Sequence, residues 1–142
     1  MSGWLIANLA GTAVMVGFIW TIQLLTYPMM QAVPAEAFVA YERSHRNRVT
    51  AVLAVLAPTE IIAAAGVVMF VGEVPSWLAL GSAGLLCAIW LSTLLFYAPL
   101  HMRLSDGFDP VVHRRLVRTN WIRTAAWTLR GAAAIAMIAV AT

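Results

Sequence analysis

Four long apolar stretches constrain the fold of this chain more than any other feature. They cover roughly residues 4–27, 50–71, 76–98 and 121–141 of a 142-residue sequence. A helix needs about 20 mainly apolar residues to cross the hydrocarbon core of a bilayer, and a backbone in lipid must satisfy its own hydrogen bonds. We therefore predict an all-α fold, a bundle of four transmembrane helices.

The composition agrees with this prediction. Hydrophobic residues make up 62% of the chain and charged residues only 11%, whereas about 25% of the residues of a soluble domain are charged. The short length predicts one integral membrane domain over residues 1–142.

Basic residues outside the apolar stretches are confined to two of the three predicted connections. The first connection contains Arg43, Arg46 and Arg48, and the third contains Arg103, Arg114, Arg115 and Arg118. Basic connections stay on the cytoplasmic side of the cell (inner) membrane, so we expect a multi-pass protein with both termini outside. A one-sided arginine layer also favours membrane lipids over nucleic acid as partners.

The chain weakly repeats itself at an offset of 70 residues. Residues 19–27 and 89–97 align without a gap and share Ile, Trp, two Leu and Tyr. We interpret the halves, about 1–72 and 73–142, as two tandem helical hairpins. Hairpins of the same orientation form a parallel pseudo-repeat, which also occurs in some transporters.

Glu60 and Arg130 lie at the same offset, each inside an apolar stretch. A charge in hydrocarbon costs several kcal/mol or more, so such residues usually face the bundle interior and find a partner. We predict a buried ion pair between them. The pair could set the register of the helices or belong to a functional site.

Prolines and their neighbours predict where helices begin and end. Pro28 and Pro99 should end or kink the first and third helices. Pro34 marks the start of the second helix. The fourth helix should begin at Asp109, an N-cap residue, with Pro110 in the first turn.

Two polar stripes are expected to face each other. On the second helix the stripe consists of His45, Val49, Val52, Leu56 and Glu60. On the fourth helix it consists of His113, Asn120, Arg123, Trp127 and Arg130. These spacings follow one face of an α-helix, and polar residues of a spanning helix turn away from lipid. We therefore predict a pocket between the second and fourth helices.

Aromatic residues and histidines gather near the cytoplasmic boundary of this pocket. The candidate substrate-binding residues are Tyr27, Tyr97, Trp121 and Trp127. The histidines are His45, His101 and His113, and histidine suits general acid–base catalysis near neutral pH.

The same histidines allow two other interpretations. Together with Glu42 they could ligate a single metal ion, or one of them could be an axial ligand of haem. A di-iron centre needs two Glu-x-x-His motifs, and the chain has one, at Glu42 and His45. In the third interpretation the histidines only hydrogen-bond to loops and lipid headgroups.

Several short motifs resemble those of a group of small bacterial four-helix membrane proteins, mostly without assigned function. The motifs are Tyr27-Pro28, Phe38-x-x-Tyr41-x-x-x-His45, Pro58-x-Glu60, Ala98-Pro99-Leu100-His101, Gly107-Phe108-Asp109, and residues 119–124 with Trp127 and Arg130. They cover most of the chain. The Asn120…Arg123-Thr124 element is also similar to the last helix of the anthrone oxygenase-like membrane proteins, whose fungal members oxidise anthrones to anthraquinones. That similarity implies an oxygenase-like activity on an aromatic small molecule.

We therefore expect a membrane oxidoreductase or oxygenase that acts on an apolar aromatic or quinone-like small molecule. The histidines would move protons, and Asn120 and Arg123 would donate to a developing oxyanion. A non-enzymatic small-molecule or lipid binder, a transporter and an assembly subunit of a membrane complex remain alternatives. A homo-oligomer is compatible with the sequence, because four short helices leave little internal volume.

Overall fold

The computed structural model describes residues 2–142, and this part of the chain is helical without any strand. Four continuous helical segments, which we call rods 1 to 4, account for nearly all of it. Rod 1 joins α1 (Gly3–Thr21), the π-helix η1 (Ile22–Thr26) and α2 (Tyr27–Met30), and rod 2 is α3 (Ala35–Phe70). Rod 3 joins α4 (Ser76–Ser92), the π-helix η2 (Thr93–Tyr97) and α5 (Ala98–Leu104), and rod 4 is α6 (Pro110–Val140).

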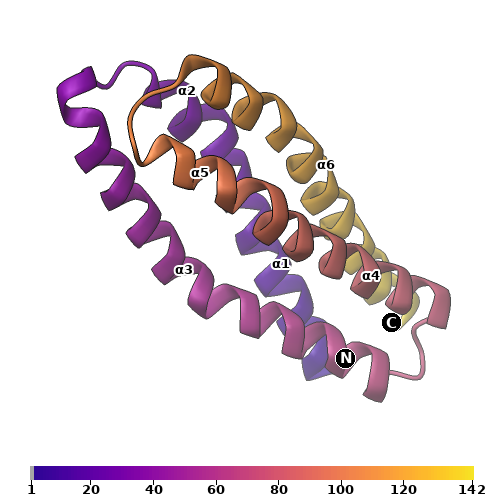
Figure 1. Cartoon of the computed structure of the whole chain (residues 1–142). Helices are drawn as coiled ribbons and strands as arrows, with labels where there is room; N and C mark the ends of the chain where they lie inside the picture. The colour runs from indigo at the N-terminus through magenta and orange to yellow at the C-terminus, as the bar shows by residue number, and fades with distance from the viewer. Residues whose placement is uncertain (1) are drawn as a thin grey trace.

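The rods run up and down in a four-helix bundle (Figure 1). Both α1 and α4 pack against α3 and α6, so the four rods surround a common core. Both termini and the connection at 71–75 lie at one end of the bundle, while the connections at 31–34 and 105–109 lie at the other.

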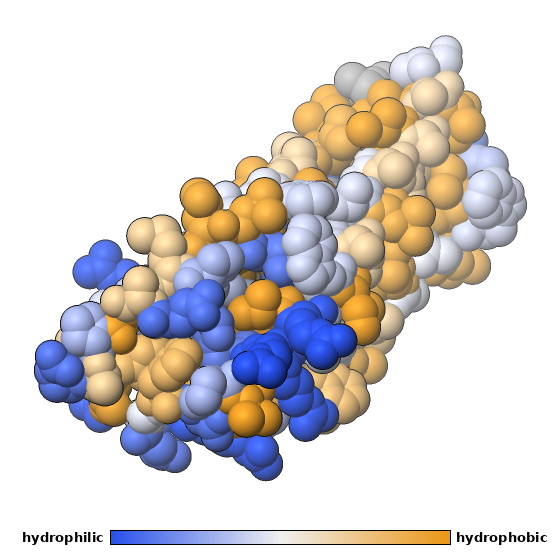
Figure 2. Space-filling view, turned by 90° about the horizontal axis from the view of Figure 1, so that it is seen from above, coloured by the Kyte–Doolittle hydropathy of each residue, from blue (hydrophilic) through white to orange (hydrophobic). Residues whose placement is uncertain are grey.

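Three of the rods are long and apolar enough to cross a membrane. They are Gly3–Met30, Ala35–Phe70 and Ser76–Leu104, with 28, 36 and 29 residues. Many large hydrophobic side chains are exposed on the bundle. On the face shown in Figure 2, hydrophilic residues gather at the end that holds the two arginine-rich connections. These features are those of a membrane protein. Rod 4 is not among the apolar segments, because inward-facing polar residues lower its hydropathy.

Of the two alternatives expected at Pro28 and Pro99, an end of the helix is wrong, since rod 1 continues to Met30 and rod 3 to Leu104. A five-residue π-helix precedes each proline instead. Its last bond runs from the amide of the residue before the proline to a carbonyl five residues back. A proline ring clashes with the carbonyl four residues back, and a wider turn relieves that clash.

The predicted starts of rods 2 and 4 agree with the structure. The segment α3 begins directly after Pro34. Asp109 caps α6, and its carboxylate accepts hydrogen bonds from the amides of Val111 at 2.8 Å and Val112 at 3.2 Å.

One residue of the predicted stripe on α3 points the wrong way. Val52 is 43% exposed, whereas the neighbouring Leu53 packs against the core. The inward face of α3 therefore runs through Val49, Leu53 and Leu56 to Glu60, rotated slightly from the face that the spacing suggested.

A cluster of buried polar residues joins three rods at the level of Glu60. Arg130 and Glu60 are both fully buried and form an ion pair. The Arg130 guanidinium also donates to the hydroxyl of Thr12 and, at 2.9 Å, to the side-chain oxygen of Asn8. Gly11 makes room for the carboxylate, because a Cβ at this position would collide with Oε1 of Glu60. The expected contact between Glu60 and Arg130 is therefore present, with α1 supplying further partners.

Removing one member of this pair should destabilise the bundle. The variant Glu60→Ala leaves the Arg130 charge buried without its carboxylate, so we expect the free energy of unfolding to fall by about 3–5 kcal/mol. The double variant Glu60→Leu/Arg130→Met removes both charges and keeps most of the volume, so it should recover most of this loss. Unfolding by SDS in detergent micelles, followed by far-UV circular dichroism, measures both effects. A double variant no more stable than Glu60→Ala would contradict this account.

Candidate functional site

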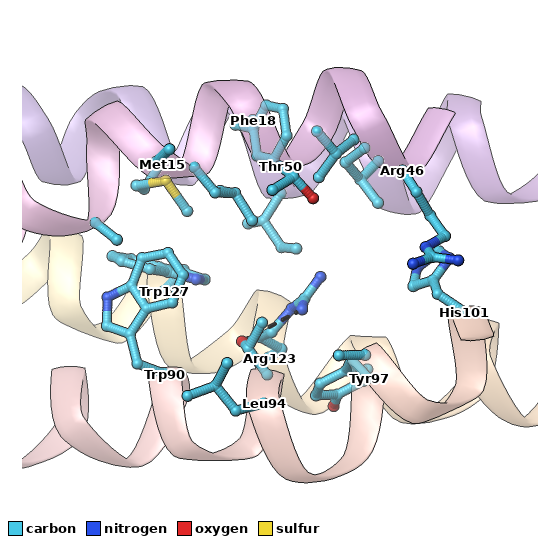
Figure 3. Close-up of a pocket in the computed structure, with 18 of the residues that line it drawn as sticks. Met15, Phe18, Arg46, Thr50, Trp90, Leu94, Tyr97, His101, Arg123 and Trp127 are labelled. Carbon is cyan, nitrogen blue, oxygen red and sulfur yellow. Dashed lines mark hydrogen bonds between the residues drawn. The ribbon is translucent and has the colours of Figure 1, made fainter. Parts of the chain in front are cut away.

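A cavity of about 520 Å³ lies among all four rods, and we call it the inner cavity (Figure 3). Its apolar wall includes Met15 and Phe18 of α1, Leu53 of α3, Trp90 of α4 and Trp127 of α6. Trp90 and Trp127 meet edge to face, with ring centroids 6.2 Å apart. Ligand pockets typically measure about 300–1,000 Å³ and are mainly apolar with a few placed polar groups, so the inner cavity has the size of a binding site.

The inner cavity opens sideways between rods 2 and 3. Ile61, Leu94 and Met102 line it and are 52%, 65% and 56% exposed. This opening faces the apolar surroundings of the bundle rather than one of its ends, so an apolar molecule could enter from the lipid.

The π-helix η2 supplies polar groups to the wall. Thr93 and Tyr97 line the cavity from this segment. The Tyr97 hydroxyl donates to the Thr119 carbonyl at 2.8 Å, which ties η2 to α6. π-Helices often occur at functional sites because they redirect side chains that a regular helix would place elsewhere.

Arg123 brings a positive charge into the inner cavity without a carboxylate partner among the residues that the structure describes. Its side chain points into the cavity from α6 (Figure 3). The Nη1 atom reaches Thr93 Oγ1 at a long 3.4 Å, and the guanidinium lies 4.4 Å from the Tyr97 ring centroid. Within residues 2–142, no carboxylate forms a salt bridge with Arg123, and its buried Nε has no acceptor. Arg130, by contrast, is paired with a carboxylate.

A chain of hydrogen bonds links a phenol, an imidazole and a carboxylate, and it starts in the cavity wall. The Tyr27 hydroxyl lies 3.0 Å from Nε2 of His101, and Nδ1 of His101 lies 2.7 Å from Oε1 of Glu42. Glu42 is fully buried. The tautomer that carries its proton on Nδ1 donates to the Glu42 carboxylate and leaves Nε2 as an acceptor. Tyr27 can then donate to Nε2, which gives a proton relay from the cavity wall to a buried acid.

His45 lies beside this relay. It lines the inner cavity, and its ring centroid is 5.6 Å from that of His101. The imidazole stacks on Tyr41 with an interplanar angle of 6°. Unlike those of His101 and His113, its ring nitrogens form no hydrogen bond within the described part of the chain. The imidazole can therefore exchange protons with a ligand.

Three of the predicted catalytic and substrate-binding residues lie outside the inner cavity. The Nε2 atom of His113 is 2.8 Å from the Tyr27 carbonyl, next to Pro28. Asn120 donates to the Gln23 side chain at 2.7 Å. Trp121 is 46% exposed and packs edge to face on Trp20. The polar stripe on α6 extends beyond the cavity, so some of its residues contact rod 1 instead. Asn120 contacts η1, and Arg130 contacts α1.

The candidate metal ligands do not converge. Among residues 2–142, no three His, Cys, Asp or Glu side chains are arranged to hold a metal ion. His113 is engaged with the Tyr27 backbone, and both ring nitrogens of His101 already have partners. Glu42 and His45 therefore lack the further ligands that a metal-ion centre would need from this set.

Some residues of the site were missed by sequence reasoning. Arg46 and Thr50 line the cavity from α3, and Thr93 lines it from η2. Arg46 also donates to Ser105 at 2.6 Å. Their spacing could have indicated a shared helix face. Arg46 and Thr50 are four residues apart and follow His45, and Thr93 and Tyr97 on rod 3 are also four residues apart.

Comparison of the chain with protein-family models, curated proteins and solved structures finds no match. The resemblance to the anthrone oxygenase-like proteins therefore stays a prediction from short motifs.

The hydrogen-bond relay predicts the protonation of His101. At neutral pH its Nδ1 should be protonated, because this atom faces Glu42. Nitrogen-15 NMR of histidine-labelled protein in detergent measures this, with the signal assigned by a His101→Asn variant. The variant Glu42→Ala should abolish the preference for Nδ1, whereas Glu36→Ala, which removes an exposed carboxylate of the same helix, should not. A neutral His101 that carries its proton only on Nε2 would contradict the relay.

Proposed function

We propose that this protein is a membrane oxidoreductase of the oxygenase type that acts on an apolar aromatic, quinone-like small molecule in the inner cavity. One observation carries the proposal, namely the guanidinium of Arg123, which has no carboxylate partner in residues 2–142, in a mainly apolar wall. A preorganised positive charge in a cavity wall stabilises a ligand oxygen that is negative or becomes negative during a reaction. The apolar wall and its two tryptophans suit the aromatic part of such a ligand.

The proposed reaction begins with proton removal. In an anthrone-type ring system, a carbon-bound proton is acidic because the resulting anion is delocalised onto the ring oxygen. Arg123 would hold that oxygen. Tyr27 would take up the proton while passing its own hydroxyl proton to Nε2 of His101, and Glu42 would stabilise the imidazolium. His45 offers a second proton acceptor in the same wall.

Molecular oxygen would be the oxidant. The carbanion adds O2 to form a hydroperoxide, and loss of water then leaves a second carbonyl group on the ring. One oxygen atom of O2 remains in the product and the other leaves as water, so atoms and electrons balance. The relay returns the proton to the peroxide anion. Oxygen is apolar, so it would reach the cavity from the lipid through the same lateral opening.

We also propose how the bundle lies in the membrane. All four rods would cross it, in two hairpins related by the parallel pseudo-repeat, with arginine-rich connections in the cytoplasm and both termini outside. The burial pattern of rod 4 supports a membrane-spanning position. Its apolar residues Ile122, Leu129 and Ile135 are 71%, 63% and 61% exposed, whereas its polar residues Asn120 and Arg130 are fully buried. Each odd-numbered rod also contains a π-helix just before its proline. Insertion in the bacterial inner membrane fits the positive-inside rule.

Ligand binding should depend on Arg123. We expect 2-naphthoate to bind more tightly than naphthalene, which has the same rings without the anionic group. The variant Arg123→Gln should weaken naphthoate binding by about 10–100-fold, the usual loss of a hydrogen bond to a charged group, and leave naphthalene binding unchanged. Arg118→Gln, on the exposed face of the same helix, is the matched control. Quenching of the tryptophan fluorescence in detergent reports the binding. Equal losses in both variants would overturn the assignment of Arg123.

Turnover should depend on the relay. With anthrone and O2 as substrates, formation of anthraquinone by its absorbance should fall by at least about 100-fold in His101→Asn, since general acid–base groups contribute roughly 10²–10⁴. Trp121→Phe, which changes a residue outside the cavity, should retain activity. Activity that survives in both His101→Asn and Tyr27→Phe would exclude the relay. Binding without turnover of any such substrate would favour the non-enzymatic binder instead.

A further inference from the structure

A second hollow of about 410 Å³ lies between rods 3 and 4 on the outside of the bundle, and we call it the outer groove. The Tyr97 side chain lines both this groove and the inner cavity. Tyr97 is 6% exposed and is held to α6 by its bond to the Thr119 carbonyl. It therefore forms a fixed wall between two separate sites.

One end of the outer groove is positively charged. Arg103 of α5 and Arg115 of α6 both line it, and both are exposed. Neither side chain takes part in a salt bridge with any other residue in the range 2–142. Two arginines from different rods thus converge on one hollow without an acidic partner, at the end of the bundle where the arginine-rich connections lie.

The other part of the outer groove is apolar and open. Leu95 and Phe96 of η2 and Ile122 of α6 line it, and they are 64%, 61% and 71% exposed. These residues lie closer to the middle of their rods than the two arginines do. The groove therefore changes from charged to apolar along the direction in which a phospholipid changes from headgroup to acyl chain.

We propose that the outer groove binds one anionic phospholipid. Arg103 and Arg115 clamp its phosphate, because guanidinium groups match phosphate oxygens in geometry and charge. An acyl chain lies along Leu95, Phe96 and Ile122. Basic pockets between membrane helices on the cytoplasmic side are known to suit anionic headgroups. The apolar half distinguishes this occupant from free phosphate, and the site is independent of the reaction proposed for the inner cavity.

Lipid retention tests the proposal. The protein is purified from nanodiscs that contain equal amounts of phosphatidylglycerol and phosphatidylcholine, and native mass spectrometry gives the ratio of the two lipids retained. We expect phosphatidylglycerol to be preferred. The double variant Arg103→Gln/Arg115→Gln should lower this preference about tenfold or more. The control Arg114→Gln/Arg118→Gln removes the same charge from residues outside the groove and should lower it less than about twofold.

An equal loss in both double variants would overturn the proposal, since the preference would then reflect surface charge alone. Inorganic phosphate at millimolar concentration should not displace the retained lipid, and displacement would show that the site recognises free phosphate instead. A measurement on the unmodified protein does not depend on variant folding. Phosphatidylglycerol with a photoreactive diazirine in its acyl chain should label Leu95, Phe96 or Ile122, and labelling spread evenly over the bundle surface would contradict the site.

Discussion

The free-energy cost of burying charged side chains among apolar helices is the main constraint on how the rods of this bundle pack. Glu60 and Arg130 offset this cost by forming an ion pair, and Asn8 and Thr12 of α1 accept further hydrogen bonds from Arg130. The cluster joins rods 1, 2 and 4, so it restricts how these rods can rotate or slide. Arg123 has no such compensation. Two arginines of α6 therefore differ in role. Arg130 is paired and links rods within the bundle, whereas Arg123 has no carboxylate partner in the described chain and can interact with a ligand.

The prolines of rods 1 and 3 shape the two candidate sites through the turns that precede them. A π-helix accommodates each proline without ending the rod. In rod 3, η2 turns Thr93 and Tyr97 towards the inner cavity and presents Leu95 and Phe96 to the outer groove. In rod 1, η1 is followed at once by Tyr27, whose hydroxyl enters the relay and whose carbonyl bonds to His113. Two local backbone adjustments therefore shape both candidate sites.

Both sites lie towards the end of the bundle with the arginine-rich connections. The other half is closed by apolar clusters around Leu5, Val67 and Met137. Apolar packing is not confined to that half, since a further core cluster around Phe38, Leu104 and Leu116 lies at the end with the arginine-rich connections. A molecule dissolved in the lipid would reach Arg123 sideways without leaving the apolar phase, and the relay would connect it to the buried carboxylate of Glu42.

The sequence by itself determined the helical class, the number of rods and most of their limits, because apolar length, Pro34 and the Asp109 cap are local signals. It also indicated the contact between Glu60 and Arg130, since two charges in apolar stretches have few partners other than each other. Only the tertiary structure decided which polar residues share a cavity. Asn120 turns to Gln23 and His113 to the Tyr27 carbonyl, whereas His101 joins Glu42. These choices depend on the rotation of each rod and on residues far away in the chain, which spacing along one helix does not specify.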